Sequence, residues 1–146
     1  MSVSTAIKLL KRLNELCEQF RAEGDIACDV ELDESHTRFD DEVSEVVFRT
    51  VRELLTNVRQ HARARRVAVS SAYRRDGSIG ITVADDGIGL PAHRRRGNPF
   101  DESGGIGLWS IDQRLRAFEA MLDVDAAAGR GTKATVILPA RLITTN

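Results

Sequence analysis

The chain of 146 residues is long enough for one compact domain and too short for two well-packed ones, which excludes a self-contained two-domain enzyme. Its 21 Lys and Arg residues nearly balance 22 Asp and Glu residues, and the net charge of -1 disfavours nucleic acid or an anionic membrane as a partner. No apolar run approaches the roughly 20 residues that cross a bilayer, and the two cysteines form no CxxC pair. We therefore expect a domain without membrane contact in the reducing cytoplasm, within a full-length protein that can be membrane-anchored.

The first part of the chain reads as a helix, a strand and a second helix. Residues 3–22 repeat apolar positions every three or four residues with charged residues between them, which predicts an amphipathic helix. Residues 26–32 alternate imperfectly and predict a short strand. Residues 42–64 lack proline and repeat apolar residues at helical spacing, so they predict a second helix capped by Asp40 or Asp41.

The second part of the chain predicts one helix, at residues 108–118, and four strands, at residues 66–73, 78–84, 122–127 and 133–138. Asp76 and Gly77 join the first two of these strands and give a strong hairpin signal. Residues 85–107 are rich in glycine and contain a run of three arginines, which is typical of a long functional loop.

The predicted helix at residues 42–64 carries a polar row beside its apolar face. At about 100° per residue, Glu53, Asn57, Gln60 and His61 fall on this row. Asn57 lies one turn after Glu53, so a carboxylate and an amide oxygen face one cavity, as an oxygen-ligated Mg²⁺ requires. The alternative interpretation is a solvated polar face.

Three glycine-rich runs follow, at residues 85–89, 104–107 and 129–132. Taken singly, each is an ordinary turn in which glycine permits a positive φ. The run at residues 104–107 precedes a predicted helix, where backbone N–H groups can also approach a phosphate. The order of these runs after the polar row is more specific than any one of them.

In that order, the features resemble the GHKL ATPase superfamily, which includes the ATPases of type II topoisomerases, heat-shock chaperones and mismatch repair, the bacterial anti-sigma serine kinases and the sensor histidine kinases. The likeness is greatest to the catalytic and ATP-binding domain of histidine kinases that pair with NarL-type response regulators. Residues 52–62 match the N box of the family, and residues 85–89, 105–108 and 129–132 match its G1, G2 and G3 boxes. The resemblance covers residues from about 25 to 140.

The resemblance implies an α/β fold of the Bergerat type, a two-layer sandwich in which helices cover one face of a mixed sheet and an ATP lid lies over the nucleotide. It implies that residues 1–24 are the end of a preceding dimerisation-domain helix or a linker, and that residues 25–146 are the ATP-binding catalytic domain. The lid would be residues 90–103.

The same resemblance implies that the chain binds ATP with Mg²⁺ and donates the γ-phosphate to a histidine on a separate dimerisation domain. Asn57 would coordinate the metal, Glu53 would orient or deprotonate the attacking group, and Asp85 would accept a hydrogen bond from the adenine amino group. The implied cofactor-binding residues are Asn57, Gln60, His61, Asp85, Gly87, Gly89, Leu90, Gly105, Ile106, Gly107, Leu108 and Thr132.

Two features depart from the complete kinase pattern. Gln60 stands where the family commonly has a basic residue, so a phosphate-neutralising contact is missing or comes from the lid arginines. No histidine followed by an acidic residue precedes residue 25, so we expect a domain excised from a longer sensor kinase that acts on a response regulator indirectly. The alternatives are a stand-alone anti-sigma serine kinase of the same fold and a non-catalytic nucleotide-binding interaction module.

Overall fold

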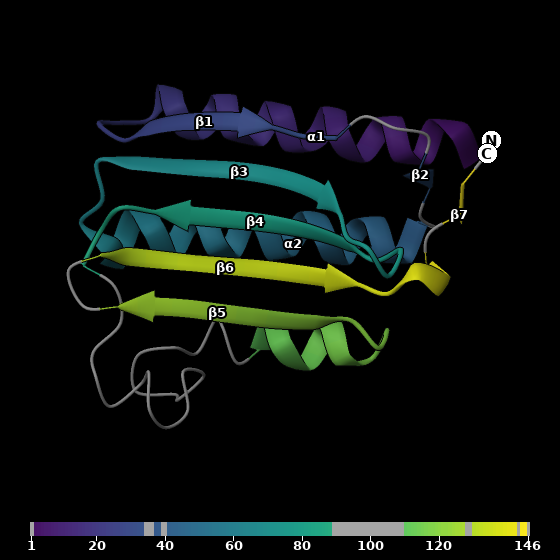
Figure 1. Ribbon diagram of the computed structural model, residues 1–146. Coiled ribbons are helices and arrows are strands. Elements are labelled where there is room, and N and C mark those ends of the chain that lie inside the picture. Colours follow the sequence, from purple (N-terminus) through teal and green to yellow (C-terminus); the bar gives the residue numbers. More distant parts are fainter. Residues whose placement is uncertain are drawn as a thin grey trace.

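The computed structural model describes residues 2–33, 37–38, 41–88, 110–127, 130–142 and 144–145. The fold has two layers, a mixed five-stranded sheet and a layer of helices that covers one of its faces (Figure 1). The strands of this sheet are β1 (Ala27–Glu31), β3 (Arg66–Tyr73), β4 (Ile79–Asp85), β5 (Met121–Ala127) and β6 (Gly131–Leu138). The helical layer consists of α1 (Ser2–Ala22), α2 (Asp41–Asn57) and the helical residues 110–116. The predicted α/β fold, with helices over one face of a mixed sheet, is therefore confirmed.

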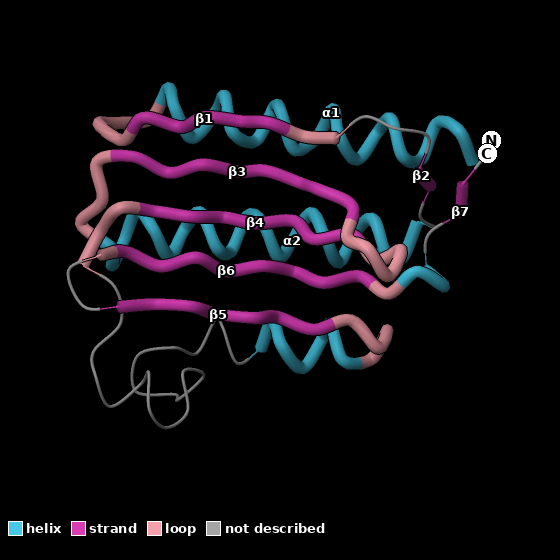
Figure 2. The backbone as a smooth tube through the Cα atoms, in the orientation of Figure 1, coloured by secondary structure: helices cyan, strands magenta, loops and turns pink. Residues whose placement is uncertain are grey.

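The strand order is β1-β3-β4-β6-β5, and Figure 2 shows the strands running side by side in front of the helices. β1 pairs in parallel with β3, and α2 lies in the connection between them, as a parallel pair requires. The remaining pairs are antiparallel. β3 and β4 form the predicted hairpin, in which Gly77 has a φ of 87°. This order brings the end of β4 next to the start of β6.

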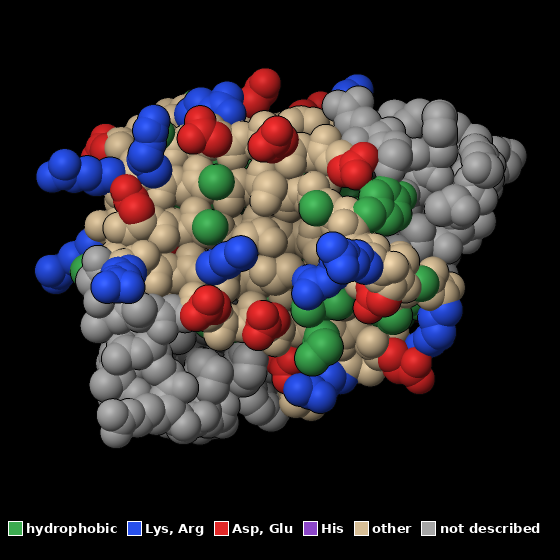
Figure 3. Space-filling model, viewed as in Figure 1, with side chains coloured by type: hydrophobic (Ala, Val, Ile, Leu, Met, Phe, Trp, Pro, Cys, Tyr) green, Lys and Arg blue, Asp and Glu red, His purple; other side chains and the backbone are tan. Residues whose placement is uncertain are grey.

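The strand β4 shows how alternation assigns the two faces of the sheet. Ile79, Ile81 and Val83 are buried, whereas Thr82 and Ala84, between and after them, are partly exposed. Because successive side chains point to opposite faces, the first set packs under the helices and the second lies on the uncovered face. Figure 3 shows that charged side chains of both signs are scattered over this uncovered face.

The core between the layers includes α1 as well as α2. Leu13 and Cys17 of α1 and Val47 and Val51 of α2 are all fully buried. Burial of each of the leucine and valine side chains among them stabilises the fold by roughly 1.5–3 kcal/mol. Among the described residues no helix, α1 included, is both long and apolar enough to cross a membrane. α1 thus packs within the core of this fold, and its continuity with a dimerisation helix stays a prediction.

The second helix ends differently from the prediction of one regular helix over residues 42–64. α2 ends at Asn57, and a π helix, η1 (Val58–Ala62), replaces its last turn. Arg63 then adopts a left-handed conformation with a φ of 52°. Periodicity detects the helical residues but cannot detect the wider i to i+5 hydrogen bonding of a π turn, because the same side chains suit both geometries.

A small second sheet was also not predicted. β2 (Thr37–Arg38) pairs with β7 (Thr144–Thr145) in antiparallel fashion, next to the N-terminal end of α1 in Figure 1. Each strand has two residues, which is too short for alternation to be recognised in the sequence. This pair ties the end of the chain to the connection before α2.

Candidate functional site

The predicted site residues that the structure describes lie at one end of the fold. α2 and η1 end there, β4 ends there at Asp85, and β6 begins there at Gly131 (Figure 1). Asp85 pairs with Thr132 in the register of β4 and β6. The described parts of the N, G1 and G3 boxes thus lie at the same end of the fold.

Asp85 is a half-buried carboxylate at the end of β4. Its Oδ1 accepts a hydrogen bond of 2.8 Å from the backbone N–H of Gly87. Burial raises the pKa of the Asp85 carboxyl, and backbone hydrogen bonds from Gly87 and Thr132 oppose that shift. A partly desolvated carboxylate gains from any further hydrogen-bond donor, so Asp85 is well suited to accept one from a ligand.

The neighbouring Asp86 has a structural task. Its Oδ1 accepts hydrogen bonds from the backbone N–H groups of Arg65 and Arg66, at 2.8 and 3.0 Å. These bonds lower the pKa of the exposed Asp86 carboxyl. Asp86 thus links the end of β4 to the start of β3.

Gly131 makes the close contact between β6 and β4 possible. Its φ is 89°, and a Cβ added to it would overlap the carbonyl oxygen of Asp85 and lie 2.8 Å from the carbonyl carbon. No other amino acid fits this position without a backbone shift. The sequence placed Gly131 in the G3 box but gave it no site role, and the structure shows that it sets the backbone against which Asp85 rests.

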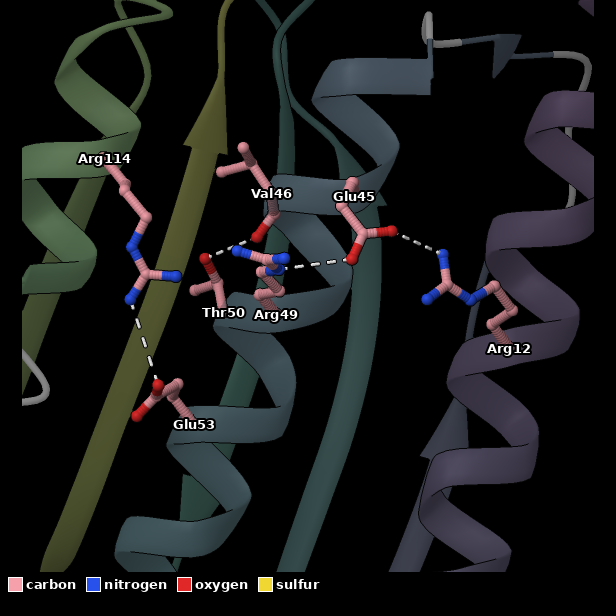
Figure 4. Close-up of polar contacts among 7 residues, drawn as sticks. All are labelled: Arg12, Glu45, Val46, Arg49, Thr50, Glu53 and Arg114. Atoms are coloured by element: carbon pink, nitrogen blue, oxygen red, sulfur yellow. Dashed lines mark hydrogen bonds and ion pairs between the residues drawn. The ribbon is translucent and has the colours of Figure 1, made fainter.

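Glu53 lies at the rim of the helical layer, on α2. Its Oε1 is 3.9 Å from Nη2 of Arg114, which belongs to the helical residues 110–116 (Figure 4). The two side chains are 40% and 35% exposed, respectively, so the pair is accessible from outside. Sequence analysis missed Arg114, because a contact between two helices is not visible in the periodicity of either one.

Asn57 and Gln60 flank the start of the π turn. Asn57 is partly buried and makes no side-chain capping bond to the described backbone of η1, whereas Gln60 is exposed. A π turn followed by a left-handed arginine is a strained local geometry, and such geometries are concentrated at functional sites. The backbone of His61 also belongs to this turn.

The remaining predicted residues fall outside the described part of the chain. They are the predicted lid at residues 90–103 and the candidate nucleotide-binding residues Gly89, Leu90, Gly105, Ile106, Gly107 and Leu108.

A hollow of about 400 Å³ lies beside the end of β4 and includes Asp85 and Thr132. It is lined by Ala84, Asp85, Asp125, Arg130, Gly131, Thr132 and Lys133.

The model of a family described as "Histidine kinase-, DNA gyrase B-, and HSP90-like ATPase" matches residues 42–142. The chain belongs to this family. The membership confirms the resemblance drawn from the four boxes, and the family's ATPase character implies that this ATPase domain binds ATP.

Relatives of the ATPase domain include sensor histidine kinases. The oxygen sensor histidine kinase NreB of Staphylococcus carnosus is 33% identical over 106 residues, which cover 72% of this chain and 28% of that protein. The sensor histidine kinase LiaS of Bacillus subtilis is 28% identical over 131 residues, 90% of this chain and 34% of that protein. The chain thus spans about a third or less of the length of these relatives.

A solved structure agrees with the fold. The blue-light activated histidine kinase of Erythrobacter litoralis EL346 superposes with a TM-score of 0.69 at 25% identity, over 87% of this chain and 40% of that chain. The two-layer arrangement of the ATPase domain is therefore the one found in a histidine kinase.

Proposed function

We propose that this ATPase domain is the catalytic part of a sensor histidine kinase and donates the γ-phosphate of ATP to a histidine on a separate dimerisation domain. The observation that carries the proposal is that Asp85, Thr132 and the strained turn after Asn57 lie at the same end of the sheet (Figure 1). The half-buried carboxylate of Asp85 suits the amino group of adenine, and the side-chain oxygen of Asn57 suits a metal ion that accompanies the phosphates.

The donor set fits Mg²⁺. Asn57 offers a neutral side-chain oxygen at the end of α2. Mg²⁺ is usually bound through one or two protein oxygens, with substrate phosphates and waters as its other ligands. Asn57 would hold the ion, which when bound neutralises negative charge on the phosphates.

Phosphoryl transfer depends mainly on positioning the donor and the acceptor in line. In this proposal Asp85 holds the adenine, and Asn57 would set where the phosphates lie. Glu53 is exposed at the rim beside Arg114, where a histidine from another domain can approach it. Glu53 orients that acceptor or takes its proton.

Nucleotide binding and transfer test this proposal in two steps. Calorimetry with ADP and ATP, with and without Mg²⁺, should show binding that Mg²⁺ strengthens in wild type and does not strengthen in Asn57→Ala. Labelled ATP should then label the histidine-bearing dimerisation domain of the same kinase when it is supplied, with an acid-labile bond, and should not label this chain alone. Glu53→Gln should slow the transfer without changing nucleotide affinity.

Three outcomes would contradict the proposal. Absence of nucleotide binding would remove the ATP site. Binding without transfer would favour the non-catalytic interaction module. An acid-labile label on this chain by itself would place the phosphoacceptor here, contrary to the proposal that the acceptor histidine lies on a separate domain.

A further inference from the structure

Arg59 lies within the π turn, and its side chain contacts the C-terminal end of α1. Its Nη2 donates a hydrogen bond of 2.6 Å to the backbone carbonyl of Phe20. The guanidinium carbon lies 4.1 Å from the centroid of the Phe20 ring. The Nε atom lies 3.7 Å from a carboxylate oxygen of Glu23. One side chain thus joins η1 to the last turn of α1 by three kinds of contact.

The backbone after α1 runs close to this guanidinium group. A Cβ added to Gly24 would lie 2.6 Å from Nη1 of Arg59, closer than real Cβ contacts. Glycine at this position therefore leaves room for the arginine. The closeness also offers a way to disturb Arg59 from the side of α1 without changing η1.

These contacts stabilise both helical ends. The last carbonyl groups of a helix lack intrahelical partners, and the helix dipole makes its C-terminal end negative. Arg59 adds a shorter hydrogen bond to the Phe20 carbonyl, which also accepts one of 3.3 Å from the backbone N–H of Glu23, and it places a positive charge beside that end. The same contacts hold η1, which contains Arg59, at a fixed position on α1.

The π turn needs such a restraint because a regular α helix is the competing geometry. A π turn accommodates one extra residue, so its relaxation to α geometry would rotate the following residues by about 100° around the helix axis. Asn57 immediately precedes the turn, and Gln60 lies within it. Their relative orientation therefore depends on whether the π geometry is maintained.

We propose that Arg59 is a positioning residue for the phosphate end of the nucleotide site. It holds η1 against α1 and so fixes the orientation of Gln60 relative to Asn57 and Asp85. This inference rests on the proposed function and assigns a role to a residue that touches neither the nucleotide nor the metal.

Arg12 provides a matched control on the same pair of helices. Its guanidinium carbon lies 3.8 Å from the centroid of the Phe48 ring, and its Nη1 lies 3.1 Å from Oε1 of Glu45 (Figure 4). Arg12 therefore joins α1 to α2 by an aromatic contact and an ion pair, as Arg59 joins α1 to η1. It does so near the start of α2, far along the helix from the π turn.

The test measures how much Mg²⁺ strengthens ATP binding, which is the ratio of the dissociation constants without and with Mg²⁺. In Arg59→Ala this ratio should fall at least about tenfold, with binding in the absence of Mg²⁺ nearly unchanged, because misplacement affects mainly the phosphate end. Arg12→Ala should keep the wild-type ratio. Arg59→Lys should recover part of it, since a lysine also offers a cation to the Phe20 carbonyl. Gly24→Ala should lower it in the same direction.

A second measurement does not depend on nucleotide. Amide hydrogen exchange at residues 58–62 should be faster in Arg59→Ala than in wild type or Arg12→Ala. Equal exchange in the two variants, an unchanged Mg²⁺ ratio in Arg59→Ala, or equal losses with and without Mg²⁺ would overturn the positioning role. A wild-type chain that binds no nucleotide would overturn the proposed function, and the exchange comparison would still decide whether Arg59 holds the turn.

Discussion

The two ends of β4 carry similar turn elements in opposite electrostatic settings. At the hairpin end, Oδ1 of the exposed Asp76 accepts hydrogen bonds from the backbone N–H and the hydroxyl of Ser78, at 2.9 and 2.6 Å. These bonds lower the pKa of Asp76. At the site end, Asp85 also accepts a bond from the N–H two residues later, but its burial raises its pKa. The Asp76 carboxylate is stabilised by hydrogen bonds within its own turn. The half-buried Asp85 carboxylate would be stabilised further by a hydrogen bond from a ligand.

The glycines at the two ends differ in the same way. Gly77 and Gly131 have nearly the same φ, 87° and 89°. A Cβ on Gly77 would lie 3.2 Å from the Cβ of Ala140, a side-chain atom at the surface, whereas a Cβ on Gly131 would overlap the backbone of Asp85. The hairpin end needs glycine for its conformation, and the site end needs it for conformation and for close approach.

The largest expected effect separates these two glycines. Gly131→Ala should lower the free energy of unfolding by on the order of 3 kcal/mol or more, since backbone strain adds to a collision with the backbone. Gly77→Ala should cost about 1–2 kcal/mol, because it carries the strain of a positive φ and a minor side-chain contact. Denaturant unfolding of both variants gives the comparison directly. Similar losses would show that β6 can move away from Asp85 at little cost.

The next effect separates the two carboxylates by ligand binding. Asp85→Asn should weaken adenine nucleotide binding by about 1.5–3 kcal/mol, or roughly 10- to 150-fold, through loss of a charge-assisted hydrogen bond. Asp76→Asn should leave the affinity unchanged, since Asp76 lies at the opposite end of β4. Calorimetric titration with ADP measures both. Equal affinities for wild type and Asp85→Asn would remove the proposed role of Asp85.

The sequence was informative at both ends of β4, but for different reasons. Asp76 and Gly77 form a local turn whose chemistry is complete within a few residues, so its hairpin was predictable. The site end was predictable only as an ordered set of boxes matched to a family, because each short segment of it, taken singly, is an ordinary turn or helix face. Alternation also predicted the main strands of the sheet, because each of them is long enough for the alternation of apolar and polar residues to be recognised.

Contacts between distant elements could not be predicted in this way. The Glu53–Arg114 pair, the docking of Arg59 on Phe20 and the overlap that requires Gly131 each depend on how elements pack. The π geometry of η1 belongs to the same group, since the competing α geometry suits its side chains equally well. The sequence thus supplied the candidate site residues, whose roles stay predictions, and tertiary packing determines the local shape of this end of the fold.

The smallest expected effect is a difference in the pH dependence of stability. The folded-state pKa of Asp76 is depressed below its ordinary 3.8, so its ionised form stabilises the fold above that value, and this contribution is lost as the pH falls through the folded pKa. The folded-state pKa of Asp85 is raised above 3.8, so its contribution has the opposite sign. Stability from this group decreases as the pH rises from 3.8 through the raised pKa, because the folded state then holds a proton more tightly than the unfolded state.

The two asparagine variants should therefore diverge from wild type in opposite directions as the pH rises through the acid range. Relative to wild type, Asp76→Asn should become less stable with increasing pH, because it lacks the stabilising charge. Asp85→Asn should become more stable relative to wild type, because it no longer ionises a half-buried group. Unfolding free energies from denaturant titrations between about pH 3 and 7 give both slopes. Slopes of the same sign would mean that burial does not dominate at Asp85, and the contrast between the two ends of β4 would then rest on the glycines alone.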